Sequence, residues 1–273
     1  MPNQGKYFDI IKEKDEVFGE IQFLDSTKQI TNTLNVESQN PFHNTPKFSV
    51  SNASAVDERE SLKQKLRALG VEDLDFLIND EGIHSYYTVR ISTILNSTQH
   101  VAVAYNKNYS GRRHGEFLAT ESQVLIFDHT GTEINRFPPF NHEIDRIVLT
   151  ENSKYLGLVY GTPKDCGYDA DIHTSSVEIY NAQTLEKFTE LKDIHCPPST
   201  SVKGNSFVFR CLCDGYNFYV FRSSDQKFFH KRHSMEEYYH PTQGTHQDGV
   251  WFYENGVKTS FKNYDDYYEL LIE

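Results

Sequence analysis

The stretch that decides the fold reads Gln123-Val-Leu-Ile-Phe-Asp-His-Thr-Gly-Thr-Glu-Ile-Asn-Arg-Phe137. An apolar run leads into a polar turn that contains Asp, Thr and Gly, and a second short strand-like run follows. Apolar runs separated by such turn residues are typical of a β-hairpin. The same pattern recurs at residues 176–188 and 217–228 and, near the N-terminus, at residues 20–30.

A further strand pattern precedes three of these hairpins. Residues 94–105, 148–160 and 201–211 each carry an Asn-Ser pair followed by an apolar run. Two hairpins per repeat predict a four-stranded antiparallel sheet, and the repeats recur about every 40–55 residues, the spacing of propeller blades. We predict strands at residues 101–105, 123–128, 155–160, 176–181, 206–212 and 217–222.

Over about residues 84–262 this pattern resembles a divergent WD40-type or related β-propeller. The Trp-Asp dipeptide of such repeats is replaced by Phe127-Asp128, Tyr180-Asn181 and Phe221-Arg222. The resemblance implies a mainly β fold, an irregular small β-propeller-like array of four-stranded antiparallel blades, in a single domain of residues 1–273. A β-sandwich with a similar meander is the alternative.

Residues 54–79 break the repeat and predict a helical insertion. Ser54 is placed to cap the helix, acidic residues follow in the first turn, and Leu62, Leu66 and Leu69 share one face. Gly70 then ends the helix. We expect this insertion to cover a sheet edge or one mouth of the array, or to bind a partner.

Composition limits the partners. The 273 residues carry a net charge of −12 and include 17 Tyr and 19 Phe. An acidic chain repels phosphate groups, so we expect neither nucleic acid nor an anionic membrane as a partner, and a basic protein is favoured. The sequence shows no signal peptide, no apolar run of 18 residues and no paired-cysteine motif among Cys166, Cys196, Cys211 and Cys213, which favours a cytoplasmic protein.

Two polar stretches at equivalent places in successive repeats, residues 106–121 and 161–175, predict long loops that project on one face. The first carries Arg112, Arg113 and His114, and the second carries Asp165, Asp169 and Asp171. Partner binding and mutual ion pairing are both open for these six residues. A metal site at residues 169–173 is disfavoured, because the loop has no convincing fourth ligand.

The C-terminal stretch is acidic and aromatic, with Tyr264, Asp265, Asp266 and Tyr268 as candidate partner-binding residues. Tyr anchors interfaces, and carboxylates attract a basic partner. Alternatively, residues 267–272 form a last strand that packs inward.

No phosphate-binding glycine loop and no recognised hydrolase motif occurs, so we predict a non-enzymatic protein-binding module with no catalytic residues, no cofactor and no metal. Its most specific form is an inhibitor of a basic toxin, such as an immunity protein. Two alternatives remain: a hydrolase or lyase that acts on a small polar or sugar substrate at the propeller mouth, and a structural subunit of a larger complex.

Overall fold

The computed structural model divides the chain into two compact units, residues 1–147 and 148–273. The fold is mainly β, as predicted, and the described part contains one α-helix. The assignment of residues 1–273 to a single domain stays a prediction. The structure describes residues 7–11, 20–24, 27, 29–42, 49–51, 54–72, 74, 82–92, 100–111, 117–161, 174–195, 199–211, 216–233, 241–242, 245–246, 249–254 and 257–263.

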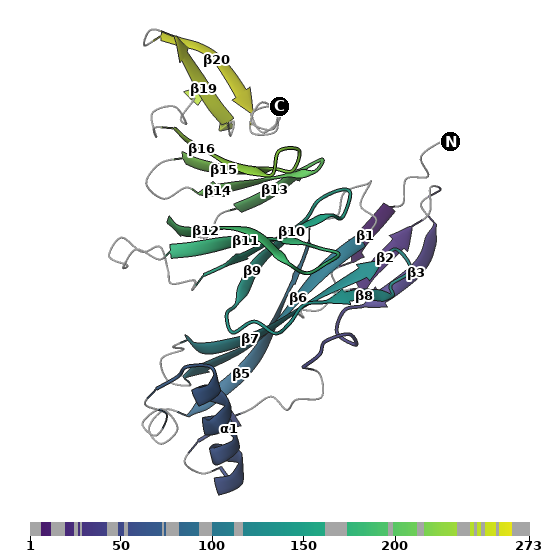
Figure 1. The fold of residues 1–273 in the computed structure, drawn as a ribbon, viewed down its shortest axis with the longest axis vertical. Coiled ribbons are helices and arrows are strands. Elements are labelled where there is room, and N and C mark those ends of the chain that lie inside the picture. The colour runs from purple at the N-terminus through teal and green to yellow at the C-terminus, as the bar shows by residue number, and fades with distance from the viewer. Residues whose placement is uncertain are drawn as a thin grey trace. The chain divides into compact units, whose positions relative to one another are not determined.

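The largest sheet of the first unit is antiparallel, with strand order β4-β5-β6-β7-β8. Figure 1 labels β5, β6, β7 and β8 of this sheet. The hairpin predicted at residues 123–137 joins its last two strands. Gly131 has a φ of +76°, and the Asp128 carboxylate accepts hydrogen bonds from the backbone N–H groups of Thr130 and Thr132 at 2.8 and 3.1 Å. The turn is therefore fixed by the residue types that predicted it. The strands are β4 (Ser49–Val50), β5 (Ile83–Ile91), β6 (His100–Gly111), β7 (Phe117–Asp128) and β8 (Glu133–Arg136).

Two elements cover one face of this sheet. A three-stranded sheet, β1 (Tyr7–Ile11), β2 (Glu20–Leu24) and β3 (Ile30–Asn35), packs Ile21, Phe23 and Leu34 against apolar residues of β6 and β7. The helix α1 (Val56–Ala68) lies where it was predicted and buries Leu62 and Leu66.

The start of α1 differs from the prediction. Its N-cap residue is Ala55, which makes no side-chain cap. The Ser54 hydroxyl accepts a hydrogen bond from the Ser51 N–H at 3.1 Å instead, so it stabilises the preceding turn. Gly70, with a φ of +85°, follows the last turn as expected.

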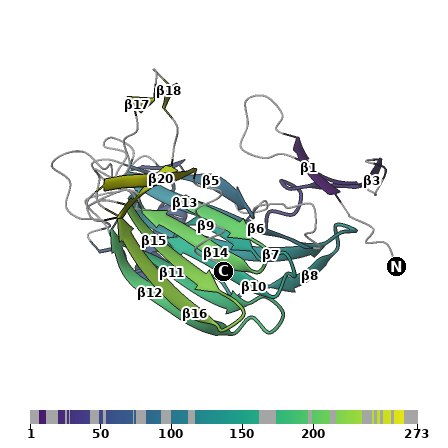
Figure 2. The ribbon, with the colours of Figure 1, turned by 90° about the horizontal axis from the view of Figure 1, so that it is seen from above.

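The two repeats from residue 144 onward form two four-stranded antiparallel sheets, with strand orders β12-β11-β10-β9 and β13-β14-β15-β16 (Figures 1 and 2). This is the blade arrangement that the paired hairpins predicted. The strands are β9 (Ile144–Leu149), β10 (Tyr155–Tyr160), β11 (Thr174–Asn181), β12 (Lys187–His195), β13 (Ser199–Lys203), β14 (Ser206–Cys211), β15 (Tyr216–Arg222) and β16 (Lys227–His233).

The core of the second unit joins these two sheets. Val148, Val159, Ile179, Phe207 and Phe209 belong to one buried cluster. Gly157 permits their close approach: a Cβ atom there would lie 2.7 Å from Val148 Cγ2 and 3.4 Å from Phe209 Cζ. Four short strands follow in two hairpins, β17 (Pro241–Thr242) with β18 (Thr245–His246), and β19 (Gly249–Glu254) with β20 (Val257–Asn263).

One prediction about the first unit is wrong. Residues 106–111 and 117–121 are not loop but the paired ends of β6 and β7. Their polar side chains form hydrogen bonds to one another inside the protein, so the stretch is polar without being exposed. Of the other predicted loop, Thr174 and Ser175 belong to β11.

Among the residues that the structure describes, no helix has the length and apolar character needed to cross a bilayer.

Candidate functional site

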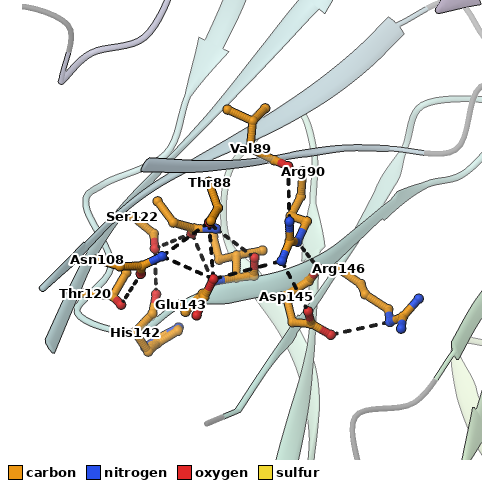
Figure 3. Close-up of polar contacts among 12 residues, drawn as sticks. Thr88, Val89, Arg90, Asn108, Thr120, Ser122, His142, Glu143, Asp145 and Arg146 are labelled. Atoms are coloured by element: carbon orange, nitrogen blue, oxygen red, sulfur yellow. Dashed lines mark hydrogen bonds and ion pairs between the residues drawn. The ribbon is translucent and has the colours of Figure 1, made fainter. Parts of the chain in front are cut away.

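A cluster of buried polar side chains lies on one face of β5, β6 and β7, beneath the segment of residues 140–145 (Figure 3). The segment crosses the three strands in order. Phe140 pairs with Ser122 on β7, the Ile144 N–H bonds to Asn106 on β6, and the Asp145 carbonyl bonds to Arg90 on β5. The cluster therefore fixes this segment on the sheet.

The strand register brings the polar side chains together. Asn106 lies between Thr88 on β5 and Ser122 on β7, and Asn108 lies opposite Thr120. Side chains at alternate positions of a strand point to the same face, and cross-strand partners share that face. Both asparagines, together with Thr120 and Ser122, are fully buried.

Asn106 uses both ends of its amide. Its Nδ2 donates to Thr88 Oγ1 at 3.1 Å and to the Ile144 carbonyl at 3.0 Å. Its Oδ1 accepts from the Ile144 N–H at 3.1 Å and lies 2.6 Å from Ser122 Oγ. Ser122 Oγ is also 2.7 Å from the His142 carbonyl, so its single proton serves one acceptor at a time.

Asn108 connects the same network to a carboxylate. Its Nδ2 donates to Glu143 Oε1 at 3.3 Å, and its Oδ1 accepts from Thr120 Oγ1 at 2.6 Å. Thr88 Oγ1 donates to the same carboxylate oxygen at 3.2 Å. Glu143 is 8% exposed, so these neutral donors stabilise a charge that has largely left water.

A charged rim surrounds the cluster where it meets solvent. Arg90 Nε donates to the Asp145 carbonyl at 2.8 Å, and its Nη2 lies 3.7 Å from Asp145 Oδ1 and 4.0 Å from Glu143 Oε1. Arg146 Nε is 3.4 Å from Asp145 Oδ2. Tyr86, on the same face of β5, is 40% exposed; burial and the nearby Glu143 carboxylate raise its pKa.

The hydroxyl groups of Thr120 and Ser122 are not arranged as nucleophiles. Thr120 donates to an amide oxygen, and Ser122 donates to an amide or a carbonyl oxygen, neither of which removes a proton. Activation of a hydroxyl requires a base within hydrogen-bond reach. The cluster therefore has a structural role: it holds the segment of residues 140–145 on β5, β6 and β7.

One hydroxyl does meet an imidazole. Ser110 Oγ on β6 lies 2.9 Å from His84 Nε2 on β5, and the two residues are directly paired across the strands. Ser110 is 4% exposed and sits within a paired strand. A substrate carbonyl could reach Ser110 only by separating the paired strands β5 and β6. The contact between Ser110 and His84 is therefore a structural polar pair across the two strands.

A smaller polar cluster lies on the second unit, around Glu178 of β11. Tyr180 donates to its carboxylate, and Lys187 Nζ lies 3.2 Å away. Burial alone would raise the pKa of Glu178, but hydrogen bonds from Tyr180, Tyr160 and Lys187 outweigh it and hold this pKa below its usual range. The carboxylate is saturated with donors, which suits a structural role.

The residues predicted to bind a partner lie outside the described residues, so their roles stay predictions. The predicted proximity of the two loops is likewise untested. The residues concerned are Arg112, Arg113, His114, Asp165, Asp169, Asp171, Tyr264, Asp265, Asp266 and Tyr268.

The sequence does not predict the polar cluster when residues 106–121 are interpreted as loop. A signal was present: Asn106, Asn108 and Ser110 alternate, as do Thr120 and Ser122, immediately beside the apolar alternation of β6 and β7. Continuous alternation predicts longer strands with one polar buried face. Within the described ranges, no group of three or more His, Cys, Asp or Glu side chains could hold a metal ion.

No family model and no curated protein matches the chain. Similar solved structures include the Pyrococcus horikoshii acylaminoacyl peptidase, with 11% identity and a TM-score of 0.31 over 54% of this chain and 32% of that one. An acylaminoacyl peptidase in complex with Z-Gly-Gly-Phe-chloromethyl ketone has 12% identity and a TM-score of 0.35 over 67% of this chain and 40% of the other. The β-propeller domain of the Trilobed protease from Pyrococcus furiosus has 10% identity and a TM-score of 0.31 over 64% and 69%. Similarity at this level assigns neither a family nor a function.

Proposed function

We propose that the chain is a non-enzymatic protein-binding module whose first unit presents a braced rim to its partner. The observation that supports this proposal is the use of the buried polar groups. Asn106, Asn108 and Thr88 hold the segment of residues 140–145 on the sheet, and the most exposed side chains at its rim are those of Tyr86 and Arg146.

Such a rim suits protein recognition. Tyr and Arg are enriched among the residues that contribute most to binding. A surface whose backbone is already fixed loses less conformational entropy when a partner docks. Tyr86 is 40% exposed, and the Arg146 side chain is 46% exposed, so both are accessible to a partner.

We expect a basic protein as the partner, because the chain carries a net charge of −12. Long-range attraction between opposite charges raises the association rate. The most specific form of the proposal, an immunity protein that neutralises a basic toxin, is supported by this net charge alone. Further candidates for the interface are Arg112, Arg113, His114, Asp165, Asp169, Asp171, Tyr264, Asp265, Asp266 and Tyr268.

The experiment is an affinity purification from the native host with three forms of the protein: wild type, Tyr86→Ser and Ile134→Ser. Ile134 is the matched control, since it is a 43% exposed large side chain on β8 of the same sheet. We expect a protein that co-purifies with wild type and with Ile134→Ser, and an affinity at least about tenfold lower for Tyr86→Ser, in the range of an interface anchor.

Thermal unfolding of all three forms shows whether the variants are folded. Equal retention by Tyr86→Ser and wild type would remove the rim from the interface. Turnover of a small substrate by the purified wild type would contradict the proposed class of function.

A further inference from the structure

The face of β6 opposite the polar cluster carries a buried lysine between two apolar clusters. Val103 and Tyr105 pack beneath the sheet of β1, β2 and β3, and Tyr109 packs beneath α1. Lys107 lies between them on the same face and is 0% exposed. An ammonium group at such a position is costly unless its surroundings stabilise it.

Among the residues that the structure describes, four titratable groups face Lys107 from the elements around it. Its Nζ lies 5.8 Å from the ring centroid of Tyr87 on β5 and 5.5 Å from that of Tyr109 on β6. Glu121 is its direct cross-strand partner on β7. Lys65 approaches from α1 and interacts with it electrostatically.

The single carboxylate of this group is shared. Glu121 Oε1 lies 2.8 Å from Lys65 Nζ and accepts a hydrogen bond from the Tyr109 hydroxyl at 2.6 Å. Glu121 therefore interacts with both lysines, through an ion pair with Lys65 and as the cross-strand neighbour of Lys107. Burial and the positive charge of Lys65 lower the pKa of Lys107 to about 8, while Glu121 acts in the opposite direction.

We propose that α1 is a proton-sensitive cover, whose docking on the sheet weakens when Lys107 gains a proton and strengthens when Lys107 loses it. The repulsion from Lys65 and the cost of burial act only on the protonated amine. Both are relieved when α1 leaves the sheet, because water then reaches Lys107 and Lys65 moves away.

The direction of the pH dependence follows from the proton balance. The amine has a pKa of about 8 under the docked helix and about 10.4 when it is exposed to water. Between these values the docked form holds fewer protons than the open form, so docking strengthens as the pH rises. Below pH 8 both forms are protonated, and docking stays at its weakest level.

Opening would expose one particular surface. Leu62 and Leu66 would leave Ile83, Tyr109 and Ala119, and the carboxylate of Glu121 would lose its partner on the helix. The result is an apolar patch with a charged centre, present more often at neutral than at alkaline pH.

The test is hydrogen exchange of the α1 amides at pH 7 and pH 9.5, corrected for the intrinsic rates. We expect the opening equilibrium of α1 to be about 25-fold smaller at pH 9.5 than at pH 7. Amides of β7 serve as the internal control, since they exchange only when the sheet itself opens. In Lys107→Met the opening of α1 should be small and independent of pH.

A second variant, Lys65→Met, tests the cause. Loss of the neighbouring positive charge should raise the pKa of Lys107 and move the pH dependence of α1 exchange upward, although the helix loses its contact with Glu121. This variant decides the matter if Lys107→Met does not fold. Wild-type exchange of α1 that is equal at both pH values, a pH dependence that persists in Lys107→Met, or a downward move in Lys65→Met would each overturn the proposal.

Discussion

The two faces of β6 bury polar side chains in different ways. On one face, Asn106 and Asn108 are neutral, and each has hydrogen-bond partners on β5 or β7 and on the crossing segment. On the other face, Lys107 is charged and shares the carboxylate of Glu121 with Lys65. The two asparagines do not titrate, so their own hydrogen bonds persist over a wide pH range, whereas the contacts of Lys107 change when it gains or loses a proton. The hydrogen bonds of Asn106 and Asn108 hold the segment of residues 140–145 in place, whereas the contacts of Lys107 respond to pH.

The largest effect should come from placing a charge at Asn106, which is neutral and fully buried. Asn106→Asp removes the two N–H donors and brings a carboxylate oxygen toward the Ile144 carbonyl, so we expect a loss of about 4 kcal/mol in the free energy of unfolding at pH 7. Burial should raise the pKa of the new carboxyl, so the loss should shrink as the pH falls toward 5. Urea unfolding of wild type and Asn106→Asp at pH 7 and pH 5 measures the loss. An equal loss at both would show that charge is not the cause.

Removing the carboxylate from the charged face should have the next largest effect. Glu121→Gln leaves Lys65 and Lys107 without their shared negative charge, and we expect it to destabilise the protein by about 2 kcal/mol at pH 7. The loss should be smaller at pH 9.5, where Lys107 is mostly neutral.

The matched control for Glu121→Gln is Glu133→Gln, which removes an exposed ion pair with Arg136 at 2.7 Å. Exposed pairs contribute little, so we expect a loss below about 1 kcal/mol. Chemical denaturation of both variants makes the comparison. Equal losses would mean that the environment of Glu121 resembles that of the surface.

A smaller loss in the free energy of unfolding should follow when Asn108 loses one hydrogen bond. Thr120→Val keeps the shape of the side chain but leaves Asn108 Oδ1 without its 2.6 Å donor, which should cost about 1 kcal/mol without pH dependence. Thr33→Val, at an exposed position of β3, is the control and should be close to neutral. A pH-dependent loss in Thr120→Val would link the two faces that we treat as separate.

Charge at the surface should act on rates more than on stability. If residues 264–268 contact a basic partner, the double substitution Asp265→Asn and Asp266→Asn should lower the association rate by roughly threefold at low salt and less at physiological ionic strength. Stopped-flow or surface-binding kinetics would measure this. An unchanged association rate in a folded variant would exclude this stretch from the interface.

The repeated hairpins were predictable because each combines an apolar strand with a turn that requires Asp, Asn or Gly. All six predicted strands occur, and α1 lies where Leu62 and Leu66 placed it. Local signals of this kind do not depend on the rest of the fold.

The polar cluster was not predictable in the same way. Asn106 and Ser122 are ordinary loop residues until the register sets them side by side and residues 140–145 close over them. The burial of Lys107 depends in addition on α1 and on the first three strands, which lie far from it in the sequence. Sequence patterns report which face a residue occupies, but not which segment covers that face.

The strict alternation along β6 also bears on how the chain avoids misfolding. β6 and β7 form a hairpin of twelve-residue strands, and such local pairings tend to form early. A slip of one residue would turn Tyr105 and Lys107 toward the segment of residues 140–145, and Asn106 toward α1 and β2. Neither the segment of residues 140–145 nor α1 and the sheet of β1, β2 and β3 could then pack against the hairpin. A hairpin in the wrong register would therefore stay uncovered, and its strands could separate and pair again.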